Sequence, residues 1–296
     1  MNVATASTKK VGLEAVEKKG WLIAHKWLLL RRFSQISILF LFLLGPAFGV
    51  WLVKGNMSSS LTLNVLPLSD PFVFLQSIIS GHLPETSAII GVVIVIGFYS
   101  LVGGRVYCSW VCPINIVTDI ADWFYRKMNI KSSVHFSKNN RYALLIAIVI
   151  VTAFSGIMVW ELVNPVTTIQ REIVFAMGYS WIAILSIFLL DALISRRAWC
   201  GRFCPMGAFY SLPGKVSLVR VNANNRSACN DCMDCYVVCP EPQVIKPVLK
   251  GAGDSSPLIL AGNCTNCGRC IDVCSENVFA FGARYSDTVS TARKLT

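Results

Sequence analysis

The fold is decided by two cysteine runs near the C-terminus, which read Cys229-Asn-Asp-Cys232-Met-Asp-Cys235-Tyr-Val-Val-Cys239-Pro240 and Cys264-Thr-Asn-Cys267-Gly-Arg-Cys270-Ile-Asp-Val-Cys274. Both runs have the spacing C-x2-C-x2-C-x3-C. Where two such runs hold two [4Fe–4S] clusters, each cluster takes three thiolates from one run and the fourth from the other. This rule assigns one cluster to Cys229, Cys232, Cys235 and Cys274, and the other to Cys264, Cys267, Cys270 and Cys239.

A zinc site and a disulfide framework are the alternatives for these eight cysteines. Zinc sites commonly use separated C-x2-C pairs. A disulfide framework needs an oxidising compartment. Ser275 stands where a proline usually follows the fourth cysteine, and this change removes no ligand. The spacing favours iron–sulfur clusters, whose irons require soft thiolate ligands.

The rest of the chain is strongly apolar, with 54% hydrophobic residues among 296. Four segments are long enough to cross a hydrocarbon core of about 30 Å as helices, at residues 34–53, 86–104, 141–160 and 178–195. We therefore expect an all-α transmembrane four-helix bundle of two 2-helix repeats. A C-terminal α+β bacterial 2[4Fe–4S] ferredoxin-like domain is expected to follow it.

Basic residues flank these apolar segments unevenly. Seven Lys and Arg precede the first segment and five lie between the second and third, whereas the two opposite loops carry only Lys54 and Arg171. The net charge of +11 therefore indicates membrane orientation, with no nucleic acid as a partner. The positive-inside rule predicts a multi-pass protein of the bacterial inner membrane with both termini in the cytoplasm.

This topology divides the chain into three expected domains. Residues 1–33 form a cytoplasmic N-terminal segment, 34–220 a membrane domain, and 221–296 the cytoplasmic ferredoxin-like domain. Within the first, residues 11–32 interleave aromatic and aliphatic residues with Lys and Arg, which is typical of a helix at the membrane interface. A basic leader without stable structure is the alternative.

The apolar part contains an internal repeat. The pattern R-x-aromatic-C-x3-C-P occurs at residues 105–113 and 197–205, and Asp70-Pro71 to Gln76 is echoed by Asn164-Pro165 to Gln170. Parallel repeats would bring the cysteine pairs of the two patterns together. The pattern supplies Cys108, Cys112, Cys200 and Cys204, for which a further iron–sulfur centre, redox-active dithiols and structural packing all stay open.

Taken together, these motifs resemble the ferredoxin-type membrane subunit of the quinol dehydrogenase that serves the Nap periplasmic nitrate reductase system. The resemblance covers nearly the whole chain. It rests on residues 30–35, on both R-x-aromatic-C-x3-C-P patterns, on Cys239-Pro-Glu-Pro-Gln-Val244, and on the second cysteine run. It implies oxidation of membrane quinol and electron transfer through iron–sulfur centres, with a periplasmic polyferredoxin partner subunit and downstream cytochromes.

A quinol site requires polar or titratable groups beside an apolar channel. The candidates are Gln76, His82, Glu161 and Gln170, together with Asp191 inside the fourth apolar segment. Asp191 could instead pair with Arg196 or Arg197. No catalytic residue is assigned. A redox-sensing or assembly and anchor protein for another respiratory reductase is the alternative function, and a transporter is a second one that the scarcity of charges within the spans disfavours.

Overall fold

A computed structural model of the chain describes residues 11–128, 134, 136–175, 178, 180–249 and 256–285. The chain forms two compact units, and each combines segments that are distant in sequence. Unit 1 contains Met1–Phe33, Tyr99–Trp110 and Ser211–Thr296. Unit 2 contains Ser34–Phe98 and Val111–Tyr210. The two cysteine runs therefore fold together with the N-terminal segment and with a short central segment.

Unit 1 is built on a two-stranded antiparallel sheet and two short helices. Strands β4 (Val219–Asn222) and β5 (Ala280–Ala283) pair from Val219 opposite Ala283 to Asn222 opposite Ala280. Helices α12 (Asp234–Val238) and α13 (Arg269–Val273) each lie within one cysteine run. The remaining short helical turns are η5 (Pro213–Lys215), η6 (Arg226–Ala228), η7 (Pro242–Val244) and η8 (Lys246–Val248). Buried Val, Ile and Phe side chains fill the space between these elements.

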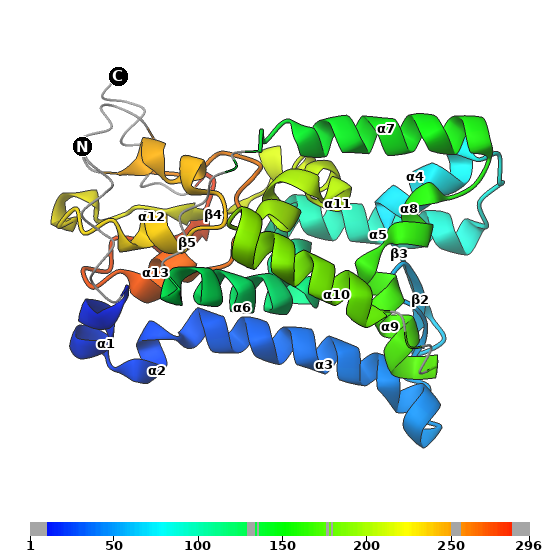
Figure 1. Cartoon of the computed structure of the whole chain (residues 1–296), viewed down its shortest axis with the longest axis horizontal. Helices are drawn as coiled ribbons and strands as arrows, with labels where there is room; N and C mark the ends of the chain where they lie inside the picture. The colour runs from blue at the N-terminus through cyan, green and yellow to red at the C-terminus, as the bar shows by residue number, and fades with distance from the viewer. Residues whose placement is uncertain are drawn as a thin grey trace. The chain divides into compact units, whose positions relative to one another are not determined.

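The N-terminal segment packs onto this sheet-and-helix core of unit 1. It forms α1 (Leu13–Lys19), α2 (Trp21–Ala24) and the start of α3 (Lys26–Phe48), and α1 and α2 lie beside α13 (Figure 1). The backbone amides of Trp27 and Leu28 donate to the two carboxylate oxygens of Asp272, at 3.1 and 3.0 Å. Gly268 touches Trp27 so closely that a Cβ would not fit.

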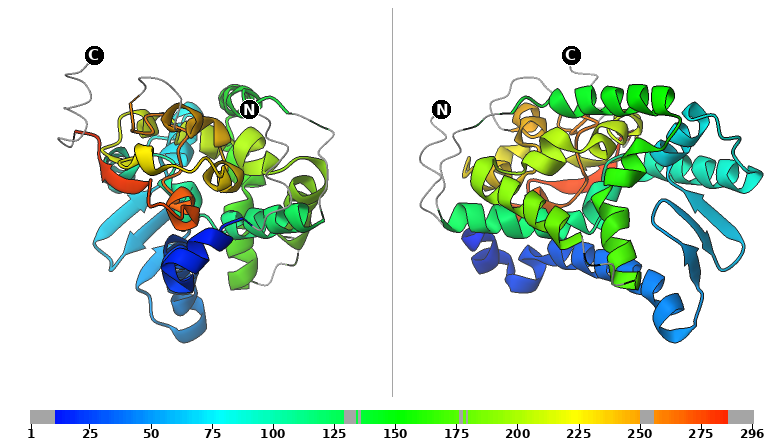
Figure 2. Two further views of the ribbon diagram at one scale, coloured as in Figure 1. Left: turned by 90° about the vertical axis from the view of Figure 1, so that its left-hand side faces the viewer. Right: turned by 45° about the vertical axis from the view of Figure 1, so that its right-hand side comes forward.

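Unit 2 consists of helices and a small antiparallel sheet of β1 (Val53–Gly55), β2 (Ser59–Thr62) and β3 (Leu66–Ser69), drawn in blue in Figure 2. Leu63 and Asn64, both with positive φ, make the turn between β2 and β3. The other elements wholly within the unit are α4 (Pro71–Ile79), α6 (Ile114–Lys127), α7 (Asn140–Ser155), α8 (Val159–Val163), α9 (Pro165–Phe175), α10 (Ser180–Leu189), η3 (Leu190–Ile194), η4 (Trp199–Phe203) and α11 (Pro205–Phe209). Helix α5 (Thr86–Val102) and the turn η2 (Tyr107–Val111) contribute residues to both units.

The expected all-α transmembrane four-helix bundle is wrong. Among the described residues, α3 is the one helix long and apolar enough to cross a membrane by length and composition. The other apolar helices, Thr86–Val102, Asn140–Ser155 and Ser180–Ile194, are shorter. They do not fill the expected ranges 86–104, 141–160 and 178–195, and part of the range 34–53 and the loop after it form the sheet β1–β3.

Local backbone chemistry explains why these helices are short. Gly103 follows α5 with a φ of 140°, a conformation that other residues rarely adopt. Gly156 ends α7 in the left-handed conformation, a common helix stop. Helix α10 changes into the π-helical turn η3 at Leu190. A hydropathy pattern counts apolar residues and does not register these stops, so it overestimates helix length.

Candidate iron–sulfur sites

The two cysteine runs form backbone loops with the same conformation. In each loop the residue before the second cysteine and the residue after it have positive φ, at Asp231 and Met233 in the first run and at Asn266 and Gly268 in the second. The helices α12 and α13 then begin, and the fourth cysteine of each run ends its helix in extended conformation. The paired left-handed residues curl the chain so that the cysteines of one loop face a common space.

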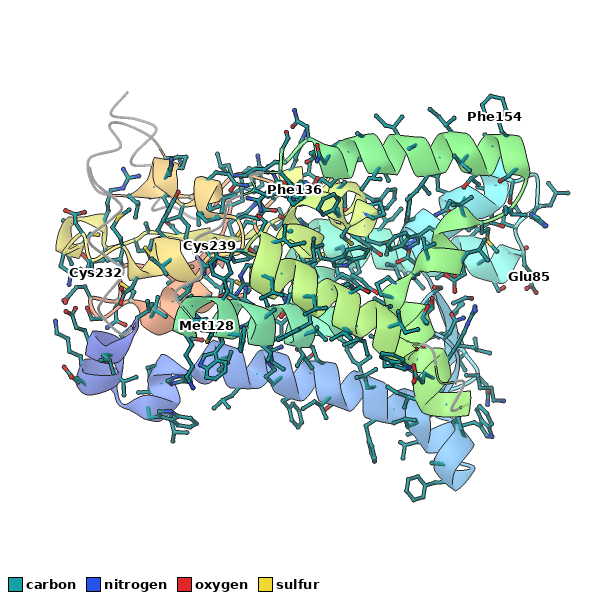
Figure 3. The ribbon with its side chains drawn as sticks, in the orientation of Figure 1. Glu85, Met128, Phe136, Phe154, Cys232 and Cys239 are labelled. Atoms are coloured by element: carbon teal, nitrogen blue, oxygen red, sulfur yellow. The ribbon has the colours of Figure 1, made fainter. Side chains whose placement is uncertain are left out.

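Two cavities lie in unit 1, and each is lined by cysteines from both runs. Cavity A is lined by Cys264, Cys267 and Cys270 of the second run and by Cys239 of the first. Cavity B is lined by Cys229, Cys232 and Cys235 of the first run and by Cys274 of the second. These two sets of four are the sets that the spacing predicts. Figure 3 shows Cys232 at the outer edge of unit 1 and Cys239 farther in.

The thiols differ in burial and in the charges around them. Burial raises the pKa of Cys264 to about 11 and that of Cys235 to about 12. Burial has the same effect on Cys267, but Arg269 and Arg31 outweigh it and lower the pKa of this thiol. Since iron binds thiolate, loading of the cavities must release protons.

The donor sets fit an iron–sulfur core. Four sulfur donors around a cavity are what a [4Fe–4S] cluster requires, with one thiolate for each iron. The twelve cysteines all lie in the described ranges and form no disulfide bond. In the part of the chain that the structure describes, no three His, Cys, Asp or Glu side chains converge closely enough for one metal ion. A cluster differs from a single ion because its four ligands are spread around four irons.

The two R-x-aromatic-C-x3-C-P patterns adopt the same local structure. Each places its first cysteine in a π-helical turn, η2 or η4, and each has its second cysteine just before a proline at which a new helix opens. Cys112 and Cys200 border one apolar cluster of unit 2, formed by Ile114, Val166, Ile169 and Ile187. Cys204 also lies in unit 2, at the start of α11, whereas Cys108 belongs to unit 1.

The polar residues considered for quinone binding have structural partners within unit 2. The Gln76 side-chain oxygen accepts from the Trp160 amide at 3.0 Å, and that of Gln170 accepts from the Met57 amide at 2.8 Å. Glu161 accepts from the Ser58 hydroxyl at 3.0 Å and from Arg171 at 3.3 Å. His82 is exposed and contacts the Ser80 hydroxyl instead.

The hydrogen-bond partner of Asp191 is a backbone amide. Asp191 accepts a hydrogen bond from the Trp199 amide at 2.9 Å, at the start of the second π-helical turn. Arg196 and Arg197 bind Asp122 of α6 instead. Sequence reasoning did not find Asp122, because an Asp on an amphipathic helix resembles any solvated residue. Its only sequence signal is its place one turn before Arg126.

Comparison with known proteins agrees with this geometry. The family "4Fe-4S dicluster domain" matches residues 228–278. The family "4Fe-4S binding domain" matches twice, at residues 85–131 and 177–223, and each match contains one of the repeated cysteine patterns. Together with the cysteine loops, these matches define an iron–sulfur electron-transfer protein of the ferredoxin type. No solved structure matches the chain.

The relatives narrow this class to one family. The chain is 47% identical over 277 residues to the ferredoxin-type protein NapH of Haemophilus influenzae, covering 94% of this chain and 96% of that protein. It is 46% identical over 280 residues to NapH of Escherichia coli, with the same two coverages. It is 50% identical over 270 residues to the methylamine utilization ferredoxin-type protein MauN of Paracoccus denitrificans, covering 91% and 95%. The chain belongs to this family of ferredoxin-type proteins.

Proposed function

We propose that this protein is the electron-transfer subunit of a quinol dehydrogenase. In this role it passes electrons from membrane quinol through iron–sulfur centres toward a periplasmic nitrate reductase chain. The observation that carries the proposal is the pair of cavities, each lined by three cysteines of one run and the fourth of the other. The resemblance of the repeated patterns and cysteine runs to the Nap-system subunit supports the quinol and nitrate parts.

The ligand sets follow from the cavities. Cys229, Cys232, Cys235 and Cys274 would hold one [4Fe–4S] cluster, and Cys264, Cys267, Cys270 and Cys239 the other. Bound clusters supply one-electron carriers, and two such carriers match the two electrons that quinol releases with its two protons. The protein residues would hold the clusters and set the charge around each cavity. The cysteines of the repeated patterns remain candidates for a further centre or for dithiols.

The membrane assignment rests on α3 and its flank. A helix of 23 residues is about 34 Å long, enough for a hydrocarbon core of about 30 Å. Lys26, Arg31 and Arg32 lie in its first two turns, which supports a cytoplasmic location of this end by the positive-inside rule. Because Asp272 binds the amides at the same end, the cysteine runs would also face the cytoplasm of the bacterial inner membrane. Trp21, Leu22 and Ile23 are exposed there and suit the interface with lipid.

The partners would be a periplasmic polyferredoxin subunit and downstream cytochromes. The relatives named for methylamine utilization favour a second candidate function. Their sequence identity to this chain equals or exceeds that of the NapH proteins. In that case the protein would carry electrons in methylamine metabolism instead. The alternative of a redox sensor or assembly protein predicts clusters that change state without sustained turnover.

Anaerobic purification followed by iron, sulfide and EPR measurements tests this proposal. We expect about eight irons per chain, and their reduction by quinol when the partner subunit is present. Cys239→Ser and Cys274→Ser should each disturb a cluster whose other three ligands lie in the opposite run. Ser275→Ala changes the residue directly after Cys274 and is the matched non-ligand control. Absence of iron, or reduction that never leads to quinol turnover, would contradict the proposal.

A further inference from the structure

The two cavities of unit 1 lie in opposite electrostatic surroundings. Four buried arginines surround cavity A, from four different segments of the unit; they are Arg31, Arg105, Arg220 and Arg269. Arg269 lines the cavity wall. Glu241 and Ile259 line it too, and they accept hydrogen bonds from Arg105 and Arg220 respectively.

Hydrogen bonds fix these arginines in place. Arg105 donates to Glu241 at 2.7 Å and to the Asn263 carbonyl at 3.2 Å. Arg220 donates to the backbone carbonyls of Ser217, Gly214, Ile259 and Ala261, so its charge is held without a carboxylate among these partners. Glu241 and Asp272 offset two of the four positive charges. A positive balance therefore remains around cavity A.

Cavity B has an acidic environment and one exposed cysteine. Asp231 lines it, and Cys232 is exposed. The Asp231 carboxylate lies 3.7 Å from the sulfur of Cys229, and the Asp234 carboxylate, two residues after Cys232, accepts from the Gly12 amide at 2.9 Å. Lys19 is a basic residue close to Cys274. The balance around cavity B is negative.

We propose that the two clusters are not equivalent, and that the cluster in cavity A has the higher reduction potential and is reduced first. This inference rests on the ligand sets of the proposed function. Reduction adds one negative charge, which nearby positive charge stabilises and nearby negative charge opposes. Water around Cys232 favours the reduced form in cavity B, but it also screens the exposed acids there. The buried arginines of cavity A are screened much less.

The segment with the first repeated pattern contacts the loop of cavity A. The Ser109 hydroxyl donates to the Thr265 carbonyl at 2.7 Å, and the Trp110 indole donates to the Asn266 carbonyl at 3.1 Å. Thr265 and Asn266 lie between the first two cysteines of cavity A. An electron entering unit 1 beside Cys108 would therefore reach cavity A first. Cavity B, with Cys232 exposed, would be the site available to a soluble donor or acceptor.

An anaerobic redox titration of the full-length protein, followed by EPR, tests the order of the two clusters. Asp231→Asn removes an exposed acid of cavity B, and it should favour reduction of the lower-potential cluster about threefold while leaving the other unchanged. Arg269→Gln should disfavour reduction of the higher-potential cluster about tenfold, or about 59 mV for one electron. Arg269→Lys keeps the charge and is the matched control.

Each outcome of this titration has a defined meaning. A lower wave that moves in Asp231→Asn, and an upper wave that moves in Arg269→Gln, support the proposed order. If Asp231→Asn moves the upper wave, cavity B holds the higher-potential cluster and the proposal is overturned, even where Arg269→Gln fails to fold. The proposal is also overturned if the reduction equilibrium constants of the two clusters differ by less than threefold. Protein without iron contradicts the cluster assignment itself, which is a different failure.

Discussion

At the residue scale, the ion pair of Arg105 with Glu241 joins the first repeated pattern to the first cysteine run. Both side chains are almost fully buried, at 2% and 3% exposure, and their atoms are 2.7 Å apart. Two buried charges attract strongly but lose their hydration, so the pair adds little net stability compared with apolar residues. Removal of only one of the two side chains, however, leaves the other charge buried without its partner and strongly lowers the stability of the fold.

The first prediction concerns this pair. Arg105→Met or Glu241→Met alone should reduce the free energy of unfolding by about 3 to 5 kcal/mol, because each leaves an uncompensated buried charge. The double variant should lose less than the sum of the two. Thermal unfolding of the purified protein, followed by cluster absorbance, measures this. Arg171→Met is the control, since Arg171 is itself half exposed and its pair with Glu161 should contribute about 1 kcal/mol or less.

The second prediction concerns Asp70. Its side chain caps the N-terminus of α4 and accepts a hydrogen bond from the Tyr210 hydroxyl at 3.0 Å. Burial raises the pKa of Asp70 from 3.8 to about 6. The folded protein therefore holds this proton more tightly than the unfolded chain, and stability falls as pH rises from about 4 to about 6. A rise of about two pKa units corresponds to about 3 kcal/mol at most.

Asp70→Asn tests this pH dependence while keeping a good helix cap. Relative to wild type, the variant should gain stability as pH rises from 5 to 7, by about 1 kcal/mol, and gain nothing further above pH 7. Thermal unfolding at a series of pH values gives the comparison. A constant difference between the two proteins across this range would show that Asp70 is charged in the folded state throughout.

At the scale of elements, Asp122 joins α6 to Arg196 and Arg197, at the start of the second repeated pattern. This carboxylate is 1% exposed and binds Arg196 and Arg197. Burial opposes its ionisation, but Arg197 and Arg196 hold its pKa well below the usual range. The stabilisation from this group is therefore present at neutral pH and is lost only in strong acid.

The third prediction follows from this contact. Asp122→Asn should lower the free energy of unfolding by about 3 kcal/mol at pH 7, since two arginines lose their buried partner. Asp119→Asn, whose carboxylate is more exposed and also reaches Arg197, should cost clearly less. Limited proteolysis and thermal unfolding of both variants measure this difference. Equal losses of stability in the two variants would mean that the burial of Asp122 is unimportant.

The fourth prediction concerns α3 as a membrane element. Leu41→Arg places a charge in the middle of this helix, which should oppose membrane insertion by about 2.5 to 3.5 kcal/mol. Leu83→Arg is the matched control, because Leu83 is almost fully exposed in a loop of unit 2. Carbonate-washed membranes should retain less of the first variant than of the second. Equal retention would show that α3 is not required for attachment.

At the scale of the whole molecule, the sequence predicts the cysteine sets better than the helices. The spacing of the two runs carries the loop geometry itself, so the residues around cavities A and B follow from it. Helix lengths depend on single stops such as Gly103 and Gly156, which hydropathy averages hide. The contacts of Asp272 with Trp27 and Leu28 join residues more than two hundred positions apart, and no local pattern reports such a pairing.

The internal repeat is visible both in the sequence and in the structure. One family matches the chain twice, and the two repeated patterns share their π-helical turns. In unit 2, Gln76 from the first half binds the backbone of Trp160 in the second, and Gln170 from the second half binds the backbone of Met57 in the first. The glutamines that the repeat singled out thus tie its halves together.

The fifth prediction concerns the independence of the C-terminal region. Residues 211–296 alone should bind much less iron than the full chain, because they lack the partners of Glu241 and Asp272. Iron per chain after identical reconstitution of the two samples is the measurement. A fragment that retains the full iron content would show that the N-terminal and central segments only cover the domain.

Unit 1 also constrains the order of events during biosynthesis. The ribosome delivers its first segment, ending at Phe33, long before its last one, which begins at Ser211. At roughly 5 to 20 residues per second, the early segment waits roughly 10 to 40 seconds for the cysteine runs that it covers. The cysteine set of cavity A is complete only at Cys270 and that of cavity B at Cys274, so a chain that terminates before Cys270 has neither set in which to hold iron.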